Sequence, residues 1–243
     1  MGRLAISLSA PLSLLLTFLQ AQEVLAQVPQ RIEATPTNGK VNASIRKKAY
    51  RYPSFIDSKV LFNNGTYTQS KLNYNVLSGE MEFINSQSDT LALDNLFTIS
   101  LIEIGEENFV YDQAGKKLLK VVRRGKNANL YVHEKYEITN MRSKGALGSE
   151  PTSLPATSAR EYFDKDGVYD LSSNTKLTYS AKSTFHLGDK NNTFVAASKR
   201  NTLKLFPKYK TELTNYFTQH NVDFDRQEDL EALLLFLDTL SSE

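Results

Sequence analysis

The chain has 243 residues, of which 40% are hydrophobic and 23% are charged, so its composition is that of a folded protein rather than a disordered one. Its 29 basic and 27 acidic residues leave a formal net charge of +2, which argues against nucleic acid as a partner, because such binders usually carry a strong basic excess. The chain contains no cysteine, which excludes disulfides, thiolate metal sites and a cysteine nucleophile.

Residues 1–26 have the layout of a secretory signal peptide. Arg3 gives a positive start, residues 4–19 form an uncharged apolar run, and the small residues Ala21 and Ala26 offer cleavage sites. The run is shorter than the roughly 20 apolar residues of a spanning helix, and it contains Pro11. We therefore expect cleavage near Ala21 or Ala26 and a mature chain in the periplasm, at the cell surface or secreted, with no transmembrane segment left.

Residues 27–196 are predicted to form a β-rich domain. Residues 71–76 (KLNYNV) alternate between polar and apolar side chains, which predicts a strand with one buried and one solvated face. A turn at Ser78 and Gly79 leads to a return strand in which Glu80 and Glu82 are expected on the solvated face. Further strands are predicted near residues 96–104, 108–111, 117–122, 129–138, 168–171 and 177–187 and around Tyr162, with a long loop over residues 141–159.

Residues 197–243 are predicted to form a helical segment packed on the same domain. Pro207 opens the first helix, which ends near Asn221. Asp225 is expected to cap the second helix, with Glu228 three residues further on. The apolar stripe of that helix contains Leu230, Leu233, Leu234, Leu237 and Leu240 and is widened by Leu235 and Phe236. The predicted class is α+β, mainly β: an antiparallel meander or half-barrel sheet with two C-terminal helices.

Three aspartates, Asp164, Asp166 and Asp170, surround Gly167 with a spacing that is found in calcium loops. The same string also fits a hairpin turn, and Lys176 stands near the position where a complete loop of that kind has a glutamate. The turn is the favoured interpretation, and the aspartates remain the metal candidate of the sequence.

A basic run is predicted on a hairpin and contains Lys116, Lys117, Lys120, Arg123, Arg124 and Lys126, with a second cluster at residues 46–48. It fits either an anion-binding face or a charge-protected edge strand, and the edge strand is favoured.

The three histidines, His133, His186 and His220, lack the spacing of metal ligands, so each is expected at the surface or at a strand end. The sequence has no nucleophile elbow and no phosphate-binding loop. These observations favour a protein that is not an enzyme and needs no cofactor.

Residues 71–83 (KLNYNVLSGEMEF), the later strand Phe109-Val110-Tyr111 and the last helix, with residues 227–230 (QEDL) at its start, resemble an uncharacterised family of exported proteins of Bacteroidota. The resemblance implies a location and an architecture but no activity.

We therefore expect an exported, soluble, non-catalytic envelope protein that acts as a binding or accessory module, with an envelope protein or a glycan as its partner. Two alternatives stay open. One is a carrier of an apolar ligand inside a curled sheet, with Tyr67, Tyr74, Phe83, Phe97 and Phe109 as candidate lining residues. The other is an envelope hydrolase, which requires carboxylates or histidines that converge in a cleft.

Overall fold

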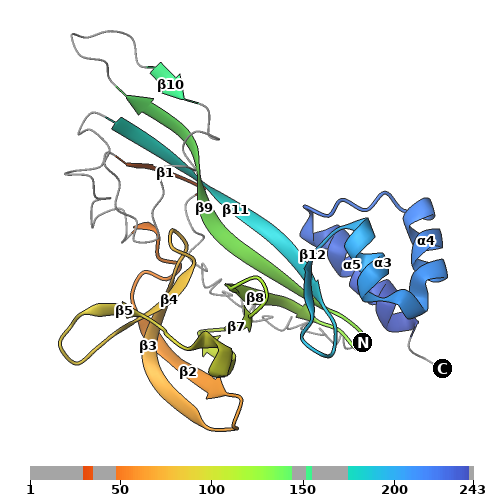
Figure 1. Ribbon diagram of the computed structural model, residues 1–243, viewed down its shortest axis with the longest axis horizontal. Coiled ribbons are helices and arrows are strands. Elements are labelled where there is room, and N and C mark those ends of the chain that lie inside the picture. The colour runs from red at the N-terminus through yellow and green to blue at the C-terminus, as the bar shows by residue number, and fades with distance from the viewer. Residues whose placement is uncertain (1–29, 35–47, 144–151, 155–174, 241–243) are drawn as a thin grey trace, which may run out of the picture.

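The computed structural model describes residues 30–34, 48–143, 152–154 and 175–240, and their strands form one antiparallel sheet (Figure 1). The order across the sheet is β1-β11-β9-β8-β7-β6-β2-β3-β4-β5, with β10 paired to β9 and β12 paired to β11. The strands are β1 (Arg31–Ala34), β2 (Ile56–Phe62), β3 (Tyr67–Asn75), β4 (Glu80–Ile84), β5 (Thr90–Ala92), β6 (Ile99–Ile104), β7 (Glu107–Asp112), β8 (Lys117–Arg124), β9 (Asn129–Ser143), β10 (Thr152–Leu154), β11 (Thr175–Gly188) and β12 (Phe194–Ala196).

The sheet is curled into a half-barrel, because strands that are far apart in its order meet on one face. The ring of Tyr74 on β3 lies 5.1 Å from that of Phe109 on β7. The Tyr74 hydroxyl donates a hydrogen bond of 2.9 Å to the carbonyl of Glu134 on β9, and the Tyr136 N–H donates one of 3.0 Å to the carbonyl of Val76. These contacts confirm the predicted half-barrel and define its inner face.

Apolar side chains fill the inner face. One row crosses four strands, since Leu91 stands opposite Phe83, Phe83 opposite Leu72, and Leu72 opposite Ile56. Leu72 is fully buried, as are Tyr74, Met81, Ile102 and Phe109. The predicted alternation of residues 71–76 is therefore confirmed for the apolar side chains.

The prediction of a solvated outer face is wrong at three polar positions on β3 and β4. Asn73, Asn75 and Glu82 are each 1% exposed, because the segment before β2 runs alongside β3 and bonds to Asn73 and Glu82. The Asn73 side chain accepts from the N–H of Tyr52 and donates to the carbonyls of Tyr52 and Ser54. Glu82 accepts hydrogen bonds from the Tyr50 hydroxyl and from the Asn75 amide, at 2.5 and 2.9 Å. These polar groups attach the segment before β2 to the sheet.

Three α-helices follow the sheet: α3 (Lys199–Leu205), α4 (Lys210–Gln219) and α5 (Gln227–Thr239). Two short 3₁₀ turns, η1 (Leu96–Thr98) and η3 (Pro207–Tyr209), precede β6 and α4. The two predicted C-terminal helices are α4 and α5, and α3 was not predicted. The apolar side chains of the three helices form a second core with Leu130 and Val132 of β9 and with Phe185 and Leu187 of β11. Figure 1 shows the helices gathered at one end of the sheet.

Three local expectations for this half of the chain are wrong. Helix α5 begins after Arg226, with no side-chain cap, and Asp225 does not cap it; instead Asp229 accepts from the N–H of Asp223. Leu235 is 51% exposed and does not widen the buried stripe. The predicted loop over residues 141–159 is also partly strand, because β9 continues to Ser143 and β10 pairs with it. Tyr162 and residues 168–171 lie outside the described residues.

Candidate functional site

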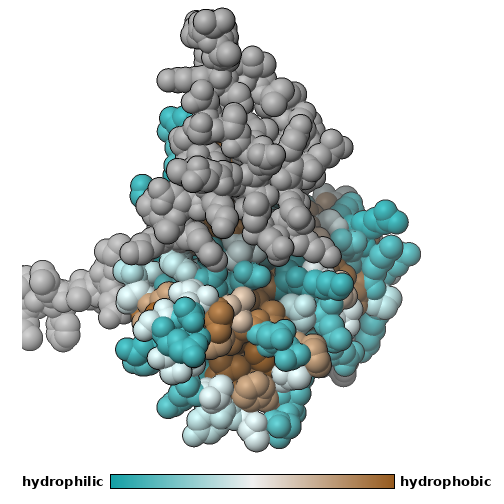
Figure 2. Space-filling view, turned by 60° about the vertical axis from the view of Figure 1, so that its left-hand side comes forward, coloured by the Kyte–Doolittle hydropathy of each residue, from teal (hydrophilic) through white to brown (hydrophobic). Residues whose placement is uncertain are grey.

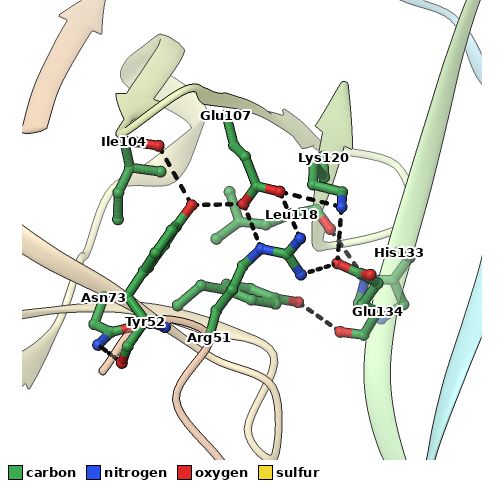
Figure 3. Close-up of polar contacts among 10 residues, drawn as sticks. Arg51, Tyr52, Asn73, Ile104, Glu107, Leu118, Lys120, His133 and Glu134 are labelled. Carbon is green, nitrogen blue, oxygen red and sulfur yellow. Dashed lines mark hydrogen bonds and ion pairs between the residues drawn. The ribbon is translucent and has the colours of Figure 1, made fainter. Parts of the chain in front are cut away.

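A charged cluster occupies the middle of the inner face, where four elements meet (Figure 3). Arg51 comes from the segment before β2, Glu107 from β7, Lys120 from β8 and Glu134 from β9. The Arg51 guanidinium bonds both oxygens of Glu107, and it donates to Glu134 at 2.5 Å. The Lys120 ammonium lies 3.3 Å from Glu107 and 3.5 Å from Glu134, and the Tyr52 hydroxyl donates to Glu107 at 2.5 Å. Two cations thus balance two carboxylates.

The electrostatics of this cluster fix its charges rather than preparing a proton transfer. Burial by itself raises the pKa of Glu107, but the hydrogen bonds and positive charge of Arg51 outweigh burial and hold that pKa below its ordinary value. Burial also raises the pKa of Tyr52, so its hydroxyl stays protonated and donates. A general acid must hold a proton near neutral pH, and Glu107 does not. The cluster therefore ties residues 51 and 52 to the sheet, and Glu107 is not the general acid of a hydrolase.

Two of the three histidines come together on the outer face. His133 stands opposite Thr184 and His186 opposite Tyr131, which makes the histidines diagonal neighbours on β9 and β11. Each Nδ1 lies 3.0 Å from a backbone carbonyl, that of Leu118 for His133 and that of Thr184 for His186, so each neutral ring carries its proton on Nδ1.

The outer-face histidines are held in their neutral form. Burial lowers the pKa of His186 to about 4, and the charge of nearby Lys117 acts in the same direction. Burial likewise lowers the pKa of His133. His186 is only 3% exposed, so the expectation of a surface position is wrong for it, whereas His220 is exposed after the end of α4. Within the described ranges, no group of three or more histidines, aspartates and glutamates is placed to hold a metal ion.

The basic run does not form one charged face, and the edge-strand interpretation is wrong, because β8 lies inside the sheet between β7 and β9. Three of its six cations have separate partners: Lys117 lies 3.9 Å from Asp112, Lys120 belongs to the inner cluster, and Arg123 lies 3.6 Å from Glu231 on α5. Residues 46 and 47 of the second cluster lie outside the described residues, as do the calcium candidates Asp164, Asp166 and Asp170.

An apolar hollow lies on the side of the half-barrel that carries β2 to β5. Figure 2 shows hydrophobic side chains gathered in a hollow of this face, with hydrophilic ones around them. Leu91 of β5 and Phe97 of η1 are 45% and 58% exposed. Phe97 and Phe62 also line a depression of about 560 Å³ beside the turn that joins β2 to β3. Exposed apolar side chains that gather in this way mark an interaction surface more often than single ones do.

The candidate lining residues of an apolar-ligand cavity are divided between core and surface. Tyr74 and Phe109 pack against each other in the core, and each is 1% exposed. Phe83 is half-buried, whereas Tyr67 and Phe97 are exposed. Sequence reasoning missed Arg51, whose place beside Glu107 and Glu134 arises only through the fold.

Comparison with known proteins gives no matching family model, no matching curated protein and no matching solved structure. Among the described residues, no helix has the length and apolar character that a membrane crossing requires.

Proposed function

We propose that the chain is an exported, non-catalytic binding module of a bacterial envelope, and that it holds an extended segment of a partner protein along β5. The signal-like residues 1–26 support the export. The observation that carries the binding role is that the apolar row of the inner face runs out to β5, the last strand of the sheet among the described residues, and ends there in the exposed Leu91.

The backbone of β5 offers hydrogen bonds to a further strand. The Asn85 N–H donates to the carbonyl of Asp89, and the Leu93 N–H donates to the carbonyl of Met81. In an antiparallel ladder the bonded positions alternate, so Thr90 and Ala92 direct their N–H and C=O groups away from β4. β5 is the last strand in the sheet order, and all three of its residues are exposed. Such an edge is a template for strand addition.

The side chains beside this edge favour a polypeptide over a small apolar ligand. An added strand places every second side chain on the inner-face side, next to Leu91, while its backbone bonds Thr90 and Ala92. The carrier alternative needs room inside the half-barrel, and the described inner face there is filled by Leu72, Tyr74 and the charged cluster. Glu107, whose pKa is lowered, is not the general acid that the hydrolase alternative requires.

The binding role is tested with peptides selected from a random 12-residue display library on the purified mature protein. We expect selected peptides to carry alternating apolar residues, and to bind Leu91→Ser and Ala92→Pro at least 10-fold more weakly by fluorescence polarisation. Proline at position 92 removes only an outward N–H and leaves the ladder with β4 intact. Leu235→Ser is the matched control, because Leu235 is similarly exposed but lies on α5.

Equal binding of the peptides to wild type, Leu91→Ser and Ala92→Pro contradicts the proposal. Binding of a fatty acid in place of any peptide, lost in Leu91→Ser, supports the carrier instead. Export is tested separately by fractionating cells and sequencing the N-terminus of the mature protein, which we expect to start after Ala21 or Ala26. An uncleaved cytoplasmic protein contradicts export.

A further inference from the structure

A second groove lies on the outer face of β3, β2 and β6, on the other side of these strands from the packed interior. It encloses about 510 Å³, within the roughly 300–1,000 Å³ range of small-molecule clefts. Its lining is polar and consists of Asp57, Ser58, Lys59, Gln69, Ser70, Lys71, Glu103 and Gly105.

The charged residues of this groove face each other without pairing. Asp57 stands directly opposite Lys71, and Lys59 stands opposite Glu103, in registers that normally favour ion pairs. Among the described residues, none of the four charged side chains has an ion pair within 4.0 Å or a hydrogen bond. Elsewhere on the same sheet, the exposed Lys182 and Glu137 do form an ion pair, with 3.1 Å between the ammonium nitrogen and a carboxylate oxygen. The groove therefore keeps two carboxylates and two ammonium groups available to a ligand.

An exposed aromatic ring stands at the end of this groove. Tyr67 lies two residues before Gln69 on β3, on the same outer face, and it is 62% exposed. The Lys59 ammonium lies over one face of its ring, 4.7 Å from the centroid. Tyrosine offers a flat apolar surface with a polar tip, which suits a ligand that is itself partly apolar and partly polar.

The charge balance of the groove selects the class of ligand. Two acids and two lysines cancel, so the groove has no net field to concentrate a polyanion or a polycation. A sugar hydroxyl both donates and accepts, so neighbouring hydroxyls can donate to Asp57 or Glu103 and accept from Lys59 or Lys71 in charge-assisted hydrogen bonds. The C–H face of a sugar ring is apolar and matches Tyr67. From these contacts we propose that the outer groove of β3, β2 and β6 binds a neutral glycan.

The test is a calorimetric titration of the mature protein with neutral hexasaccharides of glucose, xylose and N-acetylglucosamine, at 50 and 300 mM salt. We expect saturable binding of at least one of them, with an affinity that changes less than 3-fold between the two salt concentrations. Asp57→Ala and Tyr67→Ala are expected to weaken it at least 10-fold. Lys182→Ala is the matched control, because it removes an exposed charge from the outer face away from the groove.

All three variants lie on the surface, and far-UV circular dichroism with thermal melts checks that each remains folded. No binding of any hexasaccharide up to 10 mM overturns the inference, and so does binding that survives both Asp57→Ala and Tyr67→Ala. Binding of a sulfated polysaccharide alone, with steep loss at 300 mM salt, overturns it too. Leu91→Ser is expected to leave glycan binding unchanged, so this groove and the proposed β5 surface succeed or fail separately.

Discussion

Replacing Arg51 with methionine is expected to remove the guanidinium that bonds both carboxylates of the inner cluster and to leave only Lys120 beside them. The Arg51, Glu107 and Glu134 side chains are 12%, 13% and 23% exposed, so water replaces the lost bonds only in part. Breaking a buried ion pair from one side costs about 3–5 kcal/mol, and the remaining Lys120 places the expected loss near 3 kcal/mol. Against a total stability of about 5–15 kcal/mol, this is a large fraction.

The loss should depend on pH in a defined direction. In the wild type, the pKa of Glu107 lies below its ordinary value of 4.5, so the stabilisation is complete above pH 4.5 and disappears as the pH falls through the lowered pKa. In Arg51→Met, burial raises the pKa of Glu107 against weaker opposition from Lys120 and Tyr52. As the pH falls, protonation of Glu107 removes the unpaired buried charge, so the variant loses less stability than the wild type does. The difference between the two proteins should therefore be larger at pH 7.5 than at pH 4.

The measurement is urea unfolding followed by far-UV circular dichroism at both pH values. Arg31→Met is the control, because the Arg31–Glu33 pair is exposed and its loss should leave the midpoint unchanged at either pH. If Arg51→Met loses the same free energy at pH 7.5 and pH 4, the loss comes from packing, and the assignment of an electrostatic role to the cluster is refuted.

Three further predictions concern the histidine pair and the helical end. Because the folded pKa of His186 is about 4 and its ordinary value is 6.5, the folded state binds fewer protons between these values, so stability should fall by up to about 3 kcal/mol as the pH drops through this window. His186→Gln should flatten that slope in urea titrations, and an unchanged slope contradicts the assignment. Asp238→Ala removes the acceptor of the Lys126 and Asn127 N–H groups and should cost about 1–3 kcal/mol by thermal melting, whereas loss of the exposed Thr239 side chain should not. Leu234→Ala in the buried stripe of α5 should cost about 2–5 kcal/mol, and Leu235→Ala on its exposed side less than about 0.5 kcal/mol; equal losses contradict the packing described.

The hairpin of β3 and β4 and the pair of terminal helices were predictable because their signals are local. Alternation over residues 71–76 and 80–83 defines the apolar inner face, and the leucine stripe of α5 defines the side that packs on the sheet. The outer face of β3 and β4 was wrongly predicted to be solvated, because the residues that bury its polar side chains come from elsewhere in the chain. Nothing near Asn73 or Glu82 in the sequence indicates that Tyr50 and Tyr52 bond to them.

The charged cluster shows the same limit more strongly. Arg51 bonds to Glu107, 56 residues away in the sequence, and to Glu134, 83 residues away. From the sequence alone, a single charged residue in a strand is predicted to be exposed to solvent. The one local signal is Glu107 itself, a carboxylate on the inner face next to Phe109, where the period of two predicts an apolar side chain. A polar residue at such a position indicates a distant partner but does not identify it.

The position of this cluster also bears on where a ligand can bind. A half-barrel that carries its ligand inside needs an apolar, unfilled interior, and here the described centre is occupied by four charges whose hydrogen bonds hold the segment before β2. The helices cover the end of the sheet at β9 and β11. What stays accessible among the described residues is the part formed by β2 to β6, with an apolar free edge at β5 and an unpaired polar groove on the outer face. The interior therefore acts as the support that fixes these strands, and recognition is expected at their edge and outer surface.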